Sequence, residues 1–394
     1  MSVPAVLGGS PLFEKPLPFM RPTLPPFSEV SRELEDIFQT GMVTKGKYLR
    51  EFEARVAAHL GCAHAVGVSS CTTGLMLTYK AAGLTGEVVV PSFTFMATVH
   101  PLIWNSLTPV FADVDPDTWN LDPQAAEAAI TPSTSAIVAT HVFGNPADVE
   151  AFQKIAKRHG LHLIFDAAHG FGALYRGKPM GKYGDAEVFS SSPTKLLVTG
   201  EGGVVATSDA EIARKIEVGR EYGNPGDYDT EFPGLNARMQ EFSAILGIHS
   251  LSMLDANAER RNRLVGEYRE GLEEVSGIHF QKVNPGDRCS YKDLSIRVVE
   301  SEFGLSRDAL VAALKAEGID TRNYYAPPVH LHTAYREFAD QYRGKLPVTA
   351  RLATECVSLP IFSHMEPENV HRVCEAIRRI HRAAPAIRAA LRVG

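Results

Sequence analysis

The sequence contains few cysteines, and none of them is spaced to bind a metal. Five cysteines occur in 394 residues, with no CxxC pair and no zinc-type spacing. An odd number of scattered cysteines in a long chain is typical of reduced thiols. We therefore expect a cytoplasmic protein with no metal site.

The chain also lacks a basic field and a long apolar run. The formal net charge is −6, and Lys and Arg are scattered except near the C-terminus. No apolar stretch approaches the roughly 20 residues that span a bilayer, and the N-terminus lacks the signal-peptide pattern. These absences argue against nucleic acid and membrane as partners, so we expect a small-molecule partner.

The composition that remains is that of a globular protein. A hydrophobic fraction of 44% over this length can bury a large core, in two or three domains. Residues 1–27 are rich in proline and predict an extended arm, packed on the body or on a partner subunit. Residues 27–41 and 47–61 have apolar residues at helical spacing and end at glycine, which predicts two amphipathic helices.

Short β-branched runs then alternate with helical runs. The runs "HAVGVSS", "EVVVPS", "PVFADVD", "SAIVATHVFG" and "LHLIFDAA" predict strands of an α/β fold with a mainly parallel sheet. "AEVFSSS" and "GGVVATS" predict an antiparallel strand pair. A long helical stretch over about 240–272 leads into a segment of different texture. We expect a large domain over 28–260 and a smaller α+β domain over 261–394.

One lysine lies in the loop of the predicted antiparallel pair. In "VFSSSPTKLLVTGEGGVVAT", Lys195 stands between hydroxyl residues and glycines, without the GxxxxGK spacing of a phosphate-binding loop. An isolated lysine is usually solvated. A partly desolvated lysine, however, has a lowered pKa and can form a Schiff base with an aldehyde cofactor such as pyridoxal 5'-phosphate (PLP).

Such a site also needs an acid for the pyridine nitrogen, and Asp166 is the candidate. It ends the apolar run "LHLIFD", at the strand edge where open α/β sheets bind ligands. A protonated pyridine nitrogen would compensate a buried carboxylate there. The alternative for an isolated aspartate is a helix N-cap.

Phosphate donors and a stacking ring complete the set. Thr72 and Thr73 open a predicted helix whose free amides favour an anion, although plain capping explains the same residues. Ser190 can add a hydroxyl, in competition with residues 191 and 192. Phe95 can stack on the ring, or Phe93 if the strand is one residue out of phase.

At this point the sequence resembles a known family. "FDAAHGFGA", "SSSPTKLLVTGEGG" and "GLNARMQEFSAILG", in this order, are similar to motifs of the DegT/DnrJ/EryC1/StrS sugar aminotransferases, and the likeness covers nearly the whole chain. The resemblance implies an aspartate-aminotransferase-like fold of type I and a homodimer with active sites at the subunit interface. "SSCTTG" stands where the family often has Ser-Gly-Thr, and "SSSPTK" lacks an aromatic that often follows the first serine.

The resemblance also implies residue roles. Lys195 matches the Schiff-base lysine and general base, and Asp166 matches the partner of the pyridine nitrogen. Asn236 matches an asparagine that reaches the phosphate of the neighbouring subunit's cofactor. The list of matched cofactor contacts is completed by Thr72, Thr73, Ser190 and Phe95.

Two further features bear on the substrate. His169 stands where family members that aminate a sugar C4 ketone tend to have histidine and C3-aminating members glutamine. "TRNYYAPPVHLHTAY" resembles the segment bordering the substrate, which offers Tyr324, Tyr325 and His330 as wall residues, with aromatic packing as the alternative. Lys45 and Arg238 are weaker candidates for the diphosphate.

The expected reaction is transfer of an amino group from L-glutamate to a nucleotide-linked 4-keto-6-deoxyhexose, with TDP as the expected nucleotide. The same residues allow a 3-ketosugar or a ketocyclitol as the acceptor. From a different class, a regulatory protein could keep the cofactor site without catalysis. The complete set of Lys195, Asp166 and Asn236 argues against that alternative.

Overall fold

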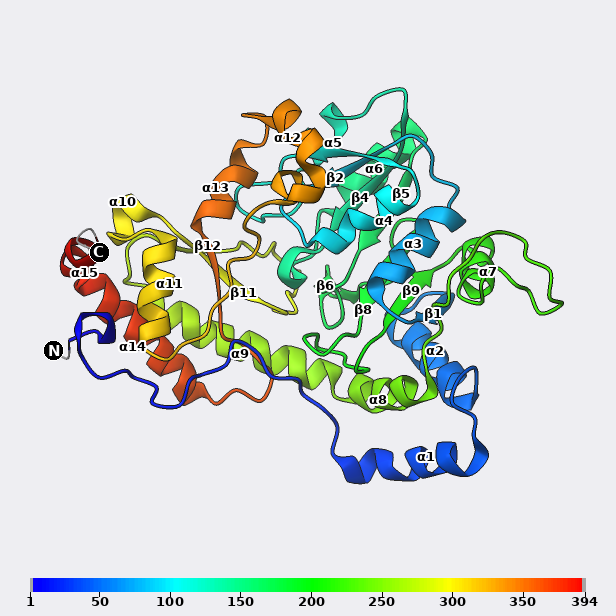
Figure 1. Ribbon diagram of the computed structural model, residues 1–394, viewed down its shortest axis with the longest axis horizontal. Coiled ribbons are helices and arrows are strands. Elements are labelled where there is room, and N and C mark those ends of the chain that lie inside the picture. Colours follow the sequence, from blue (N-terminus) through cyan, green and yellow to red (C-terminus); the bar gives the residue numbers. More distant parts are fainter. Residues whose placement is uncertain (1–2, 392–394) are drawn as a thin grey trace.

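A seven-stranded sheet forms the centre of the larger part of the molecule (Figure 1). The structure is a computed structural model and describes residues 3–391. The strand order is β1-β9-β8-β5-β4-β2-β3. β9 is antiparallel to both neighbours and the other neighbouring pairs are parallel, so the predicted α/β class and antiparallel pair are confirmed. The strands are β1 His64–Val68, β2 Glu87–Pro91, β3 Thr108–Ala112, β4 Thr134–Thr140, β5 His162–Asp166, β8 Ala186–Ser190 and β9 Gly203–Thr207.

Alternate residues of these strands face two hydrophobic cores. Val66, Ile164 and Val205 belong to one core, whereas Ala65 and Phe165 belong to the other. The period of two follows from the pleat of a strand. The first core is covered by α3 Cys71–Ala81, α4 His100–Trp104 and α7 Ala210–Gly219. The second is covered by α1 Phe27–Thr40, α2 Lys47–Leu60, α5 Pro123–Ala128, α6 Val149–His159 and α8 Glu241–Ser252.

The two predicted N-terminal helices are confirmed as α1 and α2. Each ends before a glycine in the left-handed region, Gly41 at φ 70° and Gly61 at φ 69°. The amide of each glycine bonds back to the last turn of its helix. This is the helix-ending geometry that glycine adopts without steric cost.

The long helical stretch predicted over 240–272 is divided at Met253. α8 ends at Ser252, and α9 runs over Leu254–Leu272. The Ser252 hydroxyl donates to the His249 carbonyl at 2.6 Å, and the Met253 amide bonds to the Ser250 carbonyl at 3.2 Å. A side chain therefore takes the carbonyl that the helical amide would use, and the helix changes direction there.

A smaller α+β unit follows. Its three-stranded sheet is antiparallel, in the order β10-β11-β12, with bounds Ile278–Phe280, Leu294–Val298 and Cys356–Leu359. Its helices are α10 Glu300–Phe303, α11 Arg307–Ala316, α13 Pro347–Glu355, α14 Pro367–Arg382 and α15 Ala384–Leu391. The short helix α12 Arg336–Ala339 instead packs through Phe338 on a core of the large sheet. β6 Leu174–Tyr175 and β7 Lys178–Pro179 form a separate hairpin. α9 joins the two units, since Leu254 lies in the core of the larger one and Tyr268 in the core of the smaller one.

The proline-rich arm packs on the body of its own chain. Phe13 and Leu17 are buried in the core of the smaller unit. The buried carboxylate of Glu317 accepts hydrogen bonds from the amides of Ala5 at 2.9 Å and Leu12 at 3.0 Å. In Figure 1 the arm then runs beneath the molecule to α1. The arm was expected to pack on the body or on a partner subunit, and in the structure it packs on the body.

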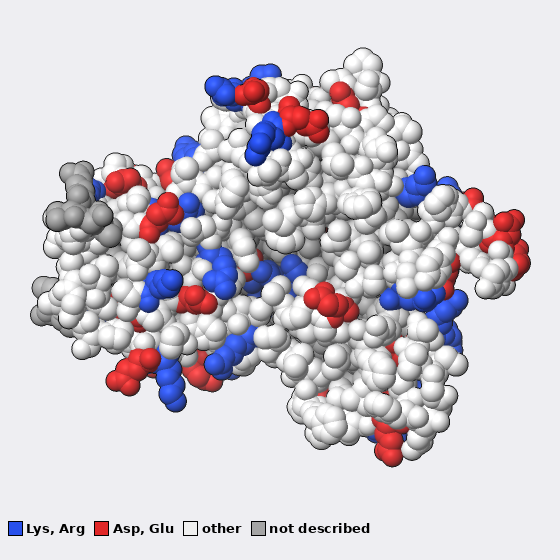
Figure 2. Space-filling model, in the orientation of Figure 1, with Lys and Arg blue, Asp and Glu red and all other residues white. Residues whose placement is uncertain are grey.

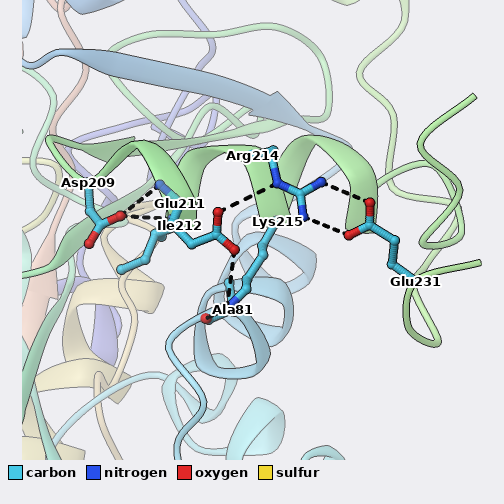
Figure 3. Close-up of polar contacts among 7 residues, drawn as sticks. All are labelled: Ala81, Asp209, Glu211, Ile212, Arg214, Lys215 and Glu231. Atoms are coloured by element: carbon cyan, nitrogen blue, oxygen red, sulfur yellow. Dashed lines mark hydrogen bonds and ion pairs between the residues drawn. The ribbon is translucent and has the colours of Figure 1, made fainter.

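α7 ties down the loop that follows it (Figure 3). Asp209 caps the helix by accepting from the amides of Glu211 and Ile212 at 2.8 and 3.0 Å. Arg214 makes a two-pronged ion pair with Glu231, at 2.9 and 2.7 Å, across to residues 220–236. This loop leads to Asn236, one of the predicted site residues. The ion pair between Arg214 and Glu231 therefore anchors the segment that carries Asn236.

The surface carries both signs of charge. On the face drawn in Figure 2, acidic and basic side chains are interspersed, and the surface is hollowed near its centre with Lys or Arg atoms inside the hollow. Within residues 3–391, no helix combines the length and the apolar character needed to cross a membrane.

Candidate active site

Lys195 lies in the loop between β8 and β9, as the sequence predicts. The glycines that follow it have a packing reason. A Cβ on Gly203 would lie 2.6 Å from the Cys71 amide nitrogen and 2.7 Å from the Ser70 carbonyl carbon. β9 can therefore start against the N-terminus of α3 only if residue 203 has no side chain, and this contact brings the helix terminus to the lysine loop.

The lysine faces a cavity of about 320 Å³. This volume lies within the usual range for a small-molecule site. The larger unit supplies most of the wall, and the smaller unit closes one side. The lining residues are Ser70, Cys71, Thr72, Phe95, Ala97, Asp166, Ala168, His169, Ser190, Ser192, Thr194, Lys195, Glu201, Gly202, Lys292, Asp293, Tyr324 and Tyr325.

Asp166 is held at the carboxyl end of β5. Its Oδ2 accepts from the Thr98 hydroxyl at 2.7 Å, and its Oδ1 accepts from the Ala168 amide at 3.0 Å. Burial raises the pKa of Asp166, while these hydrogen bonds and Lys195 act in the opposite direction. No helix starts between β5 and β6, so the helix-cap alternative is wrong. The carboxylate is positioned for a cationic group in the cavity.

The environment of Lys195 favours its free amine. Burial, followed by the nearby Lys292 ammonium, lowers the pKa of Lys195 to about 8, against the opposing effect of Asp293, Cys71 and Asp166. Just above neutral pH, a sizeable share of this lysine is therefore unprotonated. An unprotonated amine can attack an aldehyde or accept a proton.

His169 also lines the cavity, three residues after Asp166. Burial, with the positive charges of Lys195 and Lys292, lowers the pKa of His169 well below its usual value. The imidazole is therefore neutral at physiological pH. Its backbone carbonyl accepts from the Ser290 hydroxyl at 2.8 Å, which ties this turn to the smaller unit.

The predicted phosphate contacts divide into two groups. Thr72 and Ser190 line the cavity, whereas Thr73 is absent from its lining. Thr73 instead forms a capping box with Ser70, in which each side chain bonds the other residue's amide at 3.1 Å. Ser191, one of the competing serines, is buried against Thr199. For Thr73 the structure has the capping alternative that the sequence left open, whereas Ser70 was not singled out from the sequence.

Of the two candidate stacking rings, Phe95 is at the cavity. Its side chain is 49% exposed and lines the site. Phe93 is fully buried and packs edge-to-face on Phe143 and Tyr325. Of the two alternatives for the stacking ring, the structure therefore places Phe95 at the site.

The smaller unit contributes Tyr324 and Tyr325 to the wall, as expected. His330 is buried outside the lining, with its Nδ1 2.7 Å from the Ser92 hydroxyl. Sequence reasoning missed Lys292 and Asp293, which also line this side. The only signal for them was a charged dipeptide directly before the apolar run "LSIRVV".

The remaining candidates lie away from Lys195. Lys45 and Arg238 both pair with Glu221, at 3.3 and 2.9 Å. Asn236 is exposed and, with Arg238, lines a different cavity beside Val43. The structure therefore does not bring these three residues to the Lys195 site of the same chain.

Comparison with known proteins agrees with this fold and site. The model of the DegT/DnrJ/EryC1/StrS aminotransferase family matches residues 28–378. A crystal structure of DesI with its TDP-sugar product superposes with a TM-score of 0.92 at 38% identity, covering 98% of both chains. The dTDP-3-amino-3,4,6-trideoxy-alpha-D-glucose transaminase of Streptomyces venezuelae is 36% identical over 89% of this chain and 92% of its own. The dTDP-4-amino-4,6-dideoxy-D-glucose transaminase of Escherichia coli is 30% identical over 92% and 98%.

The fold and the site define a PLP-dependent aminotransferase of fold type I. The chain belongs to the DegT/DnrJ/EryC1/StrS aminotransferase family. When bound, PLP supplies an aldehyde that accepts amines and a ring that withdraws electrons from the adjacent carbon.

The residues present fit this cofactor. The buried Asp166 carboxylate lacks a cationic side chain within ion-pair distance among the described residues, and a protonated pyridine nitrogen would supply that charge. The N-terminus of α3 and the Ser190 hydroxyl offer donors for a phosphate. Lys195 offers the amine, and Phe95 an exposed aromatic face.

Proposed function

We propose that this aminotransferase moves the amino group of L-glutamate to the C4 ketone of a TDP-linked 4-keto-6-deoxyhexose. The supporting observation is His169, which lines the Lys195 cavity as a neutral imidazole. Its position matches the histidine that C4-aminating relatives tend to have. The similarity to transaminases of TDP-linked amino sugars supports the substrate class.

Within this proposal, each residue has a task at a stated atom. With the cofactor bound, the Lys195 nitrogen would hold its aldehyde and, as a free amine, would accept and return the proton at the reacting carbons. Asp166 keeps the ring nitrogen protonated, and Phe95 covers the ring. The Tyr324 and Tyr325 side chains border the space left for the sugar.

A C3 ketone is the second candidate, because the Streptomyces venezuelae relative is a transaminase of a 3-amino sugar. The test compares purified enzyme with PLP and L-glutamate on TDP-linked 4-keto-6-deoxy and 3-keto-6-deoxy hexoses, with products identified by mass and NMR. We expect a 4-amino product and a higher kcat/KM on the 4-keto sugar. His169→Gln should lower that preference.

Preferential amination of the 3-keto sugar would refute the C4 assignment. Absence of any sugar product, while L-glutamate still yields one equivalent of 2-oxoglutarate per site, would move the search to ketocyclitols. No 2-oxoglutarate at all would favour the non-catalytic, regulatory alternative.

We further propose that the enzyme works as a homodimer with shared sites. Asn236 and Arg238 line a cavity of about 490 Å³ separate from the Lys195 site, so they can serve a cofactor or substrate only in another copy. Exposed apolar side chains lie nearby along α1 and the residues after it, including Phe38 at 80% and Val43 at 49% exposure. Such a patch is suited to a second protomer.

A cytoplasmic location remains part of the proposal. Its support is that all five cysteines are free thiols.

A further inference from the structure

A second lysine faces the Lys195 cavity, and none of the roles above uses it. Lys292 is 5% exposed and Asp293 is 2% exposed, and both line the cavity. The Lys292 ammonium donates to Oδ1 of Asp293 at 2.8 Å and to Oδ2 at 2.9 Å. Burying such a pair costs desolvation energy, so its presence is weak evidence for a stabilising role.

The backbone of this pair is fixed in place. The Lys292 amide donates to the Phe143 carbonyl at 3.1 Å. The buried guanidinium of Arg261 donates from Nη1 to the carbonyls of Tyr291 at 2.9 Å and Lys292 at 3.1 Å, and from Nε to Ser363 at 3.0 Å. The ion pair is therefore held rigidly at the wall of the cavity.

Charged and titratable groups reach this cavity from several elements. Asp166 and His169 come from the end of β5 and the turn after it, Cys71 from α3, and Glu201 from the loop before β9; the segment before β11 supplies Lys292 and Asp293, and the segment after α11 supplies Tyr324 and Tyr325. Lys292 is the one cation besides Lys195 in the lining. In a site of low dielectric, a neighbouring ammonium disfavours protonation of a lysine.

We propose that Lys292 and Asp293 form a positioning pair for Lys195. Asp293 holds the Lys292 ammonium at the cavity wall, and that fixed charge adds to burial in weakening the hold of the Lys195 nitrogen on its proton, so that more of it is free to bond an aldehyde. Lys292 does not serve as the reactive amine itself, because its ammonium donates to both oxygens of Asp293. The inference rests on Lys195 being the reactive lysine of the proposed function.

The test measures the reactivity of Lys195 in the cofactor-free protein. Trace acetylation with acetic anhydride from pH 6 to 10, read by mass spectrometry of the peptide that carries Lys195, gives the pH midpoint of its free amine. We expect Lys292→Met to raise the midpoint by about one pH unit and Asp293→Asn to lower it. Lys292→Arg, which keeps the charge, should restore the wild-type midpoint.

The exposed Lys182→Met is the matched control and should leave the midpoint unchanged. If a single variant fails to fold, the double variant Lys292→Met with Asp293→Asn leaves no unpaired buried charge. Its midpoint should lie above that of the wild type, because the ammonium acts on Lys195 more strongly than the carboxylate does.

Shifts of the same sign in both single variants, or a wild-type midpoint in the folded double variant, would overturn the proposal. The probe needs neither PLP nor sugar. Failure of the sugar assay with a normal pair of shifts would therefore refute the proposed substrate and leave this inference standing.

Discussion

Lys195 and Asp166 illustrate how burial adjusts two ordinary side chains in opposite directions. Burial lowers the pKa of Lys195 to about 8 and raises the pKa of Asp166. Each shift favours the uncharged form. A cofactor that brings a cationic ring nitrogen to Asp166 and an aldehyde to Lys195 relieves both costs at once.

Replacing Lys195 with Ala should lower the turnover with L-glutamate by at least about 10²–10⁴-fold, because no other group is assigned to carry the proton. The measurement is formation of 2-oxoglutarate by the PLP-loaded enzyme. Lys182→Ala, at an exposed lysine, should retain wild-type turnover. Near-wild-type turnover in the Lys195 variant would refute its role.

Asp166→Asn should weaken PLP binding by about 10-fold or more, since a charge-assisted hydrogen bond is replaced by a neutral one. Fluorescence titration of the apo-protein with PLP measures this affinity. The Ala168 amide can still donate to the new amide oxygen, and the new NH2 group can donate to the Thr98 hydroxyl oxygen, so the variant should stay folded. An unchanged dissociation constant would show that the carboxylate does not meet the ring nitrogen.

Single site residues could be predicted from the sequence where the local pattern determines their place in the fold. Asp166 ends an apolar strand and Lys195 sits between two strands, so both could be placed from the sequence. Lys292 and Asp293 could not, because adjacent charges before a strand are normally solvated, and only the folding of the smaller unit buries them at the cavity. The sequence left Thr73 open between a phosphate contact and a helix cap, and in the structure its hydroxyl is taken by the cap.

Strand β8 carries a buried acidic residue, Glu187. Glu187 is fully buried, and its carboxylate oxygens lack a hydrogen-bond partner among the described residues. His141 Nε2, at the end of β4, lies 3.7 Å away, and the imidazole stacks on Phe165 of β5. Burial raises the pKa of Glu187 well above its usual value and lowers the pKa of His141 to about 3, and both shifts favour the neutral form.

Glu187 and His141 predict pH dependences of stability with opposite signs. Between about pH 3 and 6.5 the unfolded chain protonates His141 and the folded chain does not, so the His141 contribution rises with pH. Above about pH 4.5 the unfolded chain releases the Glu187 proton and the folded chain keeps it, so its contribution to the free energy of unfolding falls as the pH rises, by up to about 1.4 kcal/mol per unit. Glu187→Gln should remove this falling contribution between about pH 5 and 7, so the stability of the variant should rise more steeply with pH than that of the wild type. Urea unfolding at several pH values measures it, with the exposed Glu274→Gln as the control. An unaltered slope would mean that Glu187 is ionised in the folded state.

The elements themselves were predicted well where periodicity and end signals agree. α1 and α2 end at the glycines that the pattern marks, and β8 and β9 pair as expected. The division of α8 from α9 was missed, because it depends on the Ser252 hydroxyl taking the His249 carbonyl, a choice that periodicity does not contain. β12 was not identified, since its four residues pair with β11 only after α13 returns the chain.

For the whole molecule, the main prediction concerns sharing of sites between two copies. If each site takes Lys195 from one chain and Asn236 from the other, a dimer of a Lys195→Ala chain and an Asn236→Ala chain contains one intact site. Random mixing of the two inactive variants should then restore about one quarter of wild-type activity.

Mixing Lys195→Ala with Asp166→Asn is the matched control. Both residues line one cavity of the same chain, so every mixed dimer has a defect in each site and mixing should add no activity to that of the unmixed variants. Equal recovery in the two mixtures, or none in the first, would contradict shared sites.

The central claim is that Lys195, rather than its cavity neighbour Lys292, bonds the cofactor aldehyde. Reduction of the PLP-loaded protein with borohydride, followed by peptide mapping by mass spectrometry, identifies the lysine that carries the pyridoxyl group. We expect the label on Lys195 alone. A label on Lys292 would contradict it, and with it the roles assigned to the whole cavity.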